Sequence, residues 1–210
     1  MGMTVHLVGV RAEILEALRR HPSVLDLVYT CRGQVATLRE RAAQAQSGLI
    51  DHLVLAGAKL DDLVRFAAEP ALEDVDRCTH GEVDLEKTWA GIHFLLTGEP
   101  EPGRQPATAP LAWALGGSEA ALEGTPHQVA PRVVGEQAVA EVAGALKSIT
   151  ADQLRTRFDP AVLVAAGVYP ERMWKRADAL DDLLARFADL VWFYKRAAAL
   201  GWSVLVCTTL

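Results

Sequence analysis

The sequence lacks the features that would place it in or across a membrane. A bilayer span requires about 20 consecutive apolar residues. Lys195 and Arg196 interrupt the best candidate run. The start carries no basic n-region of a signal peptide, and His6 stands where a myristoylation motif requires Ser or Thr. We therefore expect a cytoplasmic protein without a membrane partner.

Cysteine is scarce. The three residues Cys31, Cys78 and Cys207 are an odd number and lie far apart in the chain. Such a set is neither a secreted disulfide framework nor a paired metal motif. One Cys–X–His arrangement, Cys78 to His80, has no second ligand pair and is a weak zinc candidate. We expect reduced thiols and no metal site.

Motifs of common enzyme classes are also absent. No G-x-S-x-G elbow surrounds Ser118, Ser148 or Ser203, and Gly116-Gly117 continues as Ser-Glu, not as the Lys-Ser/Thr of a Walker loop. A G-x-G-x-x-G fingerprint does not occur either. The sequence therefore predicts no catalytic residue and no cofactor, and a non-catalytic role is favoured over an enzyme.

Basic residues are outnumbered, with a net charge of -6 over 210 residues. Nucleic-acid binding requires an excess of Lys and Arg, so we do not expect it. The segment 61–87 holds nine acidic and three basic residues, which accounts for the whole net charge. Two interpretations stay open: a solvated helix face and loop, or a docking surface for a basic protein partner.

What the sequence does contain is an alternation of strands and helices. Half of the residues are apolar, enough for a sizeable core. The pattern predicts an α/β fold whose mixed or mainly parallel sheet is covered by helices. The expected strands are 4–10, 24–29, 129–134 and 202–208, the expected helices are 11–20, 35–46, 49–68 (as one or two), 136–147 and 179–200, and loops are expected at 70–83 and 99–110.

Several helix ends carry capping residues. Thr150 and Gln153 have capping-box spacing, and Asp159-Pro160 provides an N-cap with proline in the first helical position. Asp178 and Gly201 are expected to cap the two ends of the 179–200 helix.

The stretch from Asp84 to Gly98 predicts one capped helix that is apolar nearly all round. Such a helix is buried by neighbours on more than one side. His93 lies four residues after Trp89 and therefore beside it. Two interpretations of His93 stay open: a hydrogen-bonded structural histidine, or one that binds a ligand or transfers a proton. No second His or carboxylate follows at i+4, which argues against a metal.

This stretch resembles the YfbM-like family of bacterial proteins, a domain of unknown function. Pro110-Leu111, Phe158-Asp159-Pro160 and Val168-Tyr169-Pro170 continue the resemblance in order. The resemblance implies a single α/β domain over 1–210 with a three-layer architecture. It implies no established activity, cofactor or catalytic residue. The region 24–83 is longer than in compact members, which suggests a helical insertion near 35–68.

These observations lead to a first hypothesis of a non-catalytic binding or interaction protein, regulatory or immunity-like, that uses the acidic stretch 61–87. The alternative is a small-ligand binder or enzyme with a cleft near His93, Trp89, Arg132 and Tyr169. In a third interpretation, the helical insertion supports a homodimer.

Overall fold

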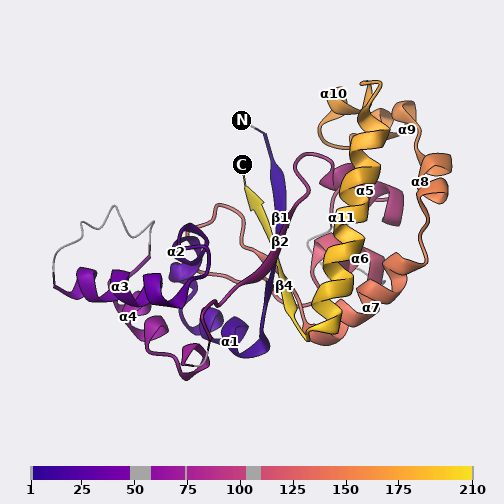
Figure 1. Ribbon diagram of the computed structural model, residues 1–210. Helices are drawn as coiled ribbons and strands as arrows, with labels where there is room; N and C mark the ends of the chain where they lie inside the picture. The colour runs from indigo at the N-terminus through magenta and orange to yellow at the C-terminus, as the bar shows by residue number, and fades with distance from the viewer. Residues whose placement is uncertain (1, 48–57, 74, 103–109, 210) are drawn as a thin grey trace.

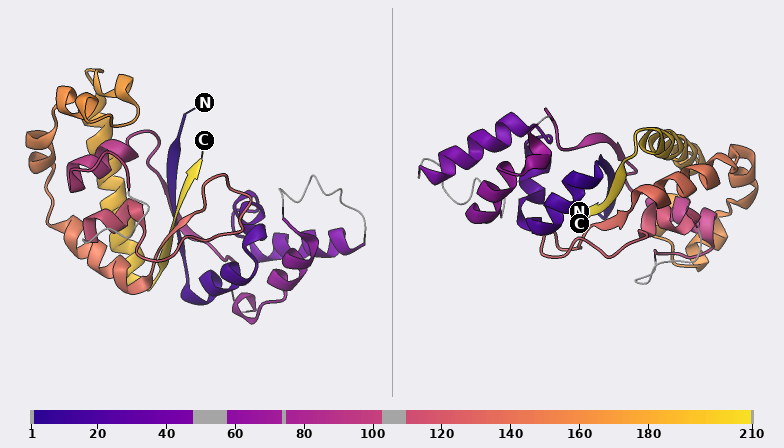
Figure 2. Two further views of the ribbon diagram at one scale, coloured as in Figure 1. Left: turned by 180° about the vertical axis from the view of Figure 1, so that it is seen from behind. Right: turned by 90° about the horizontal axis from the view of Figure 1, so that it is seen from below.

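The computed structural model describes residues 2–47, 58–73, 75–102 and 110–209. Figure 1 shows a central sheet with the N-terminal helices on one side and the helices of the C-terminal half on the other. The two further views in Figure 2 show the same three layers. The α/β class is therefore confirmed.

The sheet has four strands in the order β2-β1-β4-β3. Strand β1 pairs with β4 along its whole length, from Thr4 opposite Thr209 to Val10 opposite Ser203, and a bulge between Val8 and Gly9 interrupts its pairing with β2. The strands are β1 (Thr4–Val10), β2 (His80–Asp84), β3 (Arg132–Val134) and β4 (Ser203–Thr209).

All pairs in this sheet are antiparallel, so the expectation of a mixed or mainly parallel sheet is wrong. The prediction followed from the alternation of strands and helices along the chain. That alternation indicates only that helices cover the sheet, and they also cover both faces of this antiparallel sheet.

Strands β1, β3 and β4 send their side chains into two separate cores, one on each face of the sheet. Val204 and Val206 of β4 belong to one cluster, whereas Leu205 and Cys207 belong to the other. Strand β3 divides in the same way, with Val134 in the first cluster and Val133 in the second. The period of two along a strand thus explains why helices cover both faces.

The helices of the N-terminal layer pack on the second of these clusters. Here α3 confirms the helix expected at 35–46, whereas 24–29, expected as a strand, is mostly helical because its apolar residues are buried within this helical layer. The part 48–57 of the expected 49–68 helix lies outside the described residues. The elements are α1 (Ala12–Arg20), η1 (Pro22–Val24), α2 (Leu25–Thr30), α3 (Val35–Gln46), α4 (Leu60–Ala67) and η3 (Pro70–Leu72).

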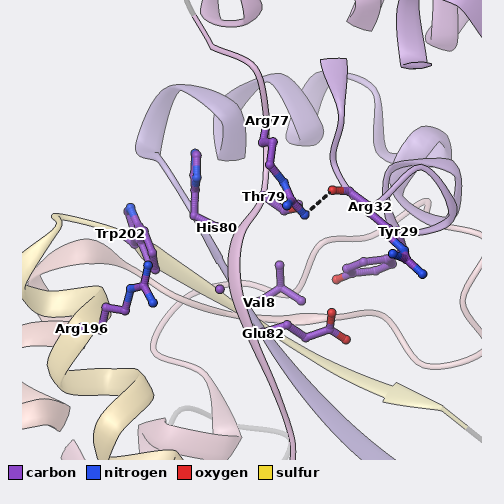
Figure 3. A pocket seen from close by; sticks show the side chains of 10 residues that line it. Val8, Tyr29, Arg32, Arg77, Thr79, His80, Glu82, Arg196 and Trp202 are labelled. Atoms are coloured by element: carbon purple, nitrogen blue, oxygen red, sulfur yellow. Dashed lines mark hydrogen bonds between the residues drawn. The ribbon is translucent and has the colours of Figure 1, made fainter. Parts of the chain in front are cut away.

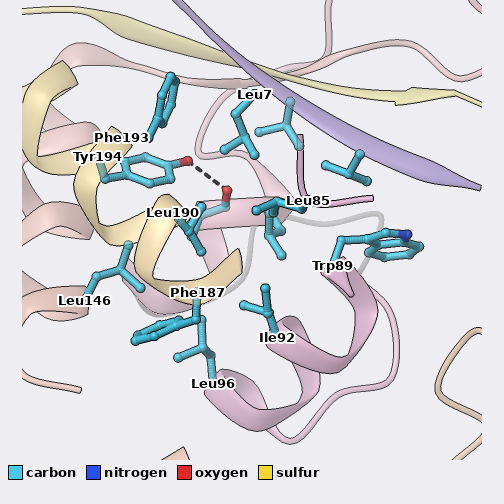
Figure 4. Close-up of a cluster of buried hydrophobic side chains, with 14 of the residues drawn as sticks. Leu7, Leu85, Trp89, Ile92, Leu96, Leu146, Phe187, Leu190, Phe193 and Tyr194 are labelled. Atoms are coloured by element: carbon cyan, nitrogen blue, oxygen red, sulfur yellow. Dashed lines mark hydrogen bonds between the residues drawn. The ribbon is translucent and has the colours of Figure 1, made fainter. Parts of the chain in front are cut away.

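The remaining helices pack on the first cluster, in which α11 contributes Phe187, Leu190 and Tyr194 (Figure 4). The capping box at Thr150 and the Asp159 cap are both present, but the side chain of Asp178 makes no capping bond to α11. These helices are α5 (Trp89–Thr97), α6 (Pro110–Gly116), α7 (Glu136–Lys147), α8 (Ala151–Arg157), α9 (Pro160–Ala165), α10 (Glu171–Trp174) and α11 (Ala179–Ala199).

The helix expected over 84–98 is shorter than predicted. Asp84 ends β2 instead of capping a helix, and its carboxylate accepts a bond from the amide of Glu86 in the following turn. Helix α5 starts at Trp89 and ends, as expected, at Gly98 in the left-handed region. Within the described residues, no helix has the length and apolar character needed to cross a bilayer.

Candidate functional site

The structure brings His93 and Arg132 together. His93 is 1% exposed, and neither ring nitrogen has a hydrogen-bond partner of normal length among the described residues. Burial first, and then the Arg132 guanidinium, lower the pKa of His93 to about 4, against a small opposing effect of the Glu101 backbone. The imidazole is therefore neutral at pH 7.

The guanidinium of Arg132 forms hydrogen bonds to main-chain groups within the fold. It donates to the main-chain oxygens of Leu115 at 3.2 Å and Pro102 at 3.3 Å. Burial lowers the pKa of Arg132. These contacts give Arg132 a structural task, because they hold the segment before α6 against β3.

Trp89 and Tyr169 form a second pair, with ring centroids 6.4 Å apart. The Tyr169 hydroxyl accepts a bond from the Met3 amide at 2.9 Å. In the part of the chain that the structure describes, two cavities lie beside β2, of about 450 Å³ and about 220 Å³. Neither of them is lined by Trp89, Tyr169, His93 or Arg132. A ligand cleft at His93 stays a prediction without a cavity to support it.

Several carboxylates of the acidic stretch 61–87 have partners within the chain. Asp62 accepts a bond from Ser23, Glu69 pairs with Arg20, and Glu86 pairs with Arg186. Asp61, Glu73 and Asp76 are exposed. Docking of a basic partner on this stretch, like the homodimer, stays a prediction.

A cavity that the sequence did not indicate opens beside β2 (Figure 3). Its volume is about 450 Å³, within the range of small-molecule sites. Its walls come from three parts of the fold: the N-terminal layer, β2 with the residues before it, and the junction of α11 with β4. The lining residues are Val8, Tyr29, Arg32, Arg77, Thr79, His80, Gly81, Glu82, Arg196 and Trp202.

Three arginines from different segments line this cavity. Among the described residues, none of Arg32, Arg77 and Arg196 forms an ion pair with a carboxylate, whereas Arg20 and Arg186 elsewhere on the surface do. Arg77 donates instead to the main-chain oxygen of Arg32 at 2.7 Å. The cavity thus has an excess of positive charge, with three guanidinium groups and the Glu82 carboxylate among its lining residues, on a protein whose net charge is -6.

Aromatic rings fix one wall of the cavity. His80 stacks on Trp202, with centroids 5.5 Å apart and planes at 20°. The Arg196 guanidinium lies 5.8 Å from the Trp202 ring and 5.3 Å from the exposed Trp192 ring, in cation–π geometry. These contacts orient the Arg196 side chain, which forms no ion pair with a carboxylate among the described residues.

One ring nitrogen of His80 makes no hydrogen bond to the described residues. This nitrogen, Nε2, is buried. Burial lowers the pKa of His80, and the charges of Arg11 and Arg77 lower it further. The ring is therefore neutral at pH 7, with an unused nitrogen at the cavity wall.

Two glycines make room for this wall. A Cβ at Gly9 would stand 2.5 Å from Trp202 Cε3, and one at Gly81 would stand 3.2 Å from Trp202 Cζ3. Any larger residue at Gly9 would therefore displace the indole. The β1–β2 bulge at Gly9 lies where the Trp202 ring crosses the sheet.

The turn after α2 positions Arg32. This residue has φ of +51°, a conformation that residues other than glycine seldom adopt. The turn is anchored by the Gly33 amide, which donates to Val28 O at 2.7 Å. Non-glycine residues in such conformations cluster at functional sites.

Sequence reasoning missed this site because its members share no motif. Arg77 was counted only as a base within an acidic stretch, Arg196 only as an interruption of an apolar run, and His80 only as half of a weak zinc pair. Trp202 was read as part of a buried strand. The convergence of these residues depends on the pairing of β1 with both β2 and β4.

Comparisons with known proteins agree with this fold and supply no activity. A family model described as a domain of unknown function, DUF1877, matches residues 1–207. The crystal structure of a protein of unknown function, YfbM from Escherichia coli, is similar, with a TM-score of 0.56 and 17% sequence identity over 98% of this chain and 99% of that one. The search of curated proteins found no match.

Proposed function

The chain belongs to the DUF1877 family of domains of unknown function, and we propose that it binds a small phosphate-bearing ligand in the cavity beside β2. The observation that carries the proposal is that three arginines, none of which forms an ion pair with a carboxylate among the described residues, line one cavity of about 450 Å³. Arginine is the side chain best suited to phosphate, because its planar fork offers two parallel donors.

The arginines are spread along the cavity. Arg32, Arg77 and Arg196 come from three different segments, and Figure 3 shows Arg32 and Arg196 at opposite ends with Arg77 between them. A carboxylate has two oxygens in one plane, whereas a phosphate presents oxygens in several directions and can accept from an arginine in more orientations. The neutral His80 ring, Thr79, Tyr29 and the Glu82 carboxylate complete the polar lining.

The cavity is built for binding, which agrees with the hypothesis of a non-catalytic protein. Burial raises the pKa of Tyr29 well above its usual value, so that its phenol stays protonated at pH 7. His80 is neutral and stacked on Trp202, and among the described residues it is not hydrogen-bonded to a hydroxyl or thiol that it could activate.

Isothermal titration calorimetry with inorganic phosphate, sulfate and acetate tests the proposal. We expect saturable binding of phosphate and sulfate and weaker binding of acetate. Arg77→Ala and Arg196→Ala should each lower the phosphate affinity about tenfold, since each removes a charge-assisted contact.

Arg155→Ala is the matched control, because Arg155 lies on exposed α8, away from the cavity. It should leave the phosphate affinity unchanged. Phosphate binding that all three alanine variants retain, or no saturable binding to the parent protein, would overturn the proposal.

A further inference from the structure

A second, smaller cavity adjoins the basic one. Its volume is about 220 Å³. The two cavities share Tyr29 and Glu82, which project toward the same space from α2 and β2 (Figure 3). The residues that line the smaller cavity are His6, Tyr29, Glu82, His127, Cys207 and Thr209.

The smaller cavity has the opposite electrostatic character. His127 Nε2 lies 2.7 Å from a carboxylate oxygen of Asp26. His6 Nδ1 lies 3.7 Å from carboxylate oxygens of both Glu82 and Asp84. Neither Lys nor Arg is among the described residues that line this cavity.

The electrostatics of the buried groups agree with this assignment. Cys207, at the back of the smaller cavity, has a pKa raised to about 12, chiefly by burial and further by the charges of Asp26 and Glu82. Those carboxylates raise the pKa of Tyr29 as well. Negative potential thus reaches the interior of the smaller cavity, where it would favour a cation.

Glu82 is difficult to explain if the ligand is only an anion. Its carboxylate shares the basic cavity with three guanidinium groups and pairs with none of them among the described residues. A negative charge there opposes the binding of phosphate. A ligand that brings a positive charge to the junction of the two cavities would turn this opposing charge into a favourable contact.

We propose that the ligand is zwitterionic, with a phosphate group in the basic cavity and a protonated amine beside Glu82 in the smaller one. This inference rests on the proposed phosphate site and adds the amine as the second recognition element. The shared wall of Tyr29 and Glu82 places the two subsites next to each other, as an aminoalkyl phosphate requires.

Matched pairs of phosphates test the inference by calorimetry at pH 7. The pairs are ethyl phosphate with O-phosphoethanolamine, and butyl phosphate with 4-aminobutyl phosphate. In at least one pair we expect the amine to raise the affinity about two- to fivefold, the gain for one exposed charge pair. Glu82→Gln should abolish this gain and leave the affinity for the plain alkyl phosphates equal or higher.

Glu141→Gln, on the exposed face of α7, is the control and should preserve the gain. Alkyl phosphates that bind through Arg77 and Arg196 with no gain from the amine in either pair would overturn the zwitterionic ligand and leave the phosphate site intact. An amine gain that survives Glu82→Gln would also overturn it. Failure of all four compounds to bind would overturn both proposals.

Discussion

The phenolic oxygen of Tyr29 lies 2.6 Å from the sulfur of Cys207, across 178 positions of sequence. This contact joins α2 of the N-terminal layer to β4 of the sheet. It also forms the back of the smaller cavity. The thiol is therefore a buried structural partner at the site.

This burial predicts slow reaction of Cys207 with alkylating reagents. Reaction requires the thiolate, and burial first raises the pKa of Cys207 to about 12. Burial gives Cys78 a pKa of about 12 as well, while the rise for Cys31 is smaller. Brief treatment of the native protein with iodoacetamide, read by mass spectrometry, should label Cys31 first.

The same treatment in denaturant is the control and should label all three cysteines equally. Fast native labelling of Cys207 would contradict the assignment, because it would show that the Tyr29 contact opens readily.

Replacing each of two helical glycines by alanine should change the free energy of unfolding in opposite directions. Alanine is favoured over glycine in a helix by about 1 kcal/mol. In α7, nothing lies within 4 Å of a Cβ added at Gly144, so Gly144→Ala should raise the free energy of unfolding by about 0.5–1 kcal/mol. In α5, a Cβ at Gly91 would stand 2.3 Å from the Trp174 ring. Gly91→Ala should therefore destabilise by about 1–3 kcal/mol.

Urea denaturation of the two variants against the parent measures both effects. A gain in stability for both variants would show that Trp174 shifts at little cost, and that the tight contact does not select glycine in α5.

The sequence predicted those parts of the fold that local chemistry decides. The Thr150 capping box, the Asp159 cap and the ends of α7 were correct, because each depends on residues within a few positions. Strand direction and β2 were missed, because β2 is half-polar and becomes a strand only through its pairing with β1. Apolar residues at 24–29 could not distinguish a buried strand from a buried helix.

The candidate site was less predictable for the same reason. His93 attracted attention as a polar residue on an apolar helix, and the structure buries it beside Arg132. The arginines of the cavity look like ordinary surface charges in sequence. Only the antiparallel pairing that brings β2 close to the start of β4 gives Arg77 and Arg196 a common cavity.

The buried His93 predicts a loss of stability in acid. Its pKa is about 4 in the folded protein, below the usual histidine value of 6.5. Since the unfolded state binds the proton more readily, this contribution is fully present above pH 6.5, declines as the pH falls and is lost near pH 4. It amounts to roughly 2 kcal/mol between about pH 8 and pH 5.

His93→Leu should flatten that part of the pH dependence, because leucine cannot take up a proton. It should also match or exceed the parent in stability at pH 7, since it removes two ring nitrogens that lack hydrogen-bond partners among the described residues. Urea denaturation at several pH values checks both points. Parallel curves for parent and variant would show that His93 does not carry the effect.

We expect the substitution Arg32→Gly to have different effects on phosphate binding and on the free energy of unfolding. Its left-handed backbone costs a non-glycine residue about 1 kcal/mol or more, which glycine avoids. Arg32→Gly should therefore leave the free energy of unfolding unchanged or raise it by up to about 1 kcal/mol. It should also weaken phosphate binding about tenfold, because it removes one guanidinium from the cavity.

Glu86 provides the matched control, since it also has a positive φ, of +48°, but lies outside the basic cavity. Glu86→Gly relieves the same backbone conformation, although it also removes the ion pair with Arg186, and should leave phosphate affinity unchanged. If Arg32→Gly lost binding and stability together, a disturbed turn would explain both losses. Weaker binding with stability preserved requires that the Arg32 side chain itself contacts the ligand, because the turn that carries it would still be folded.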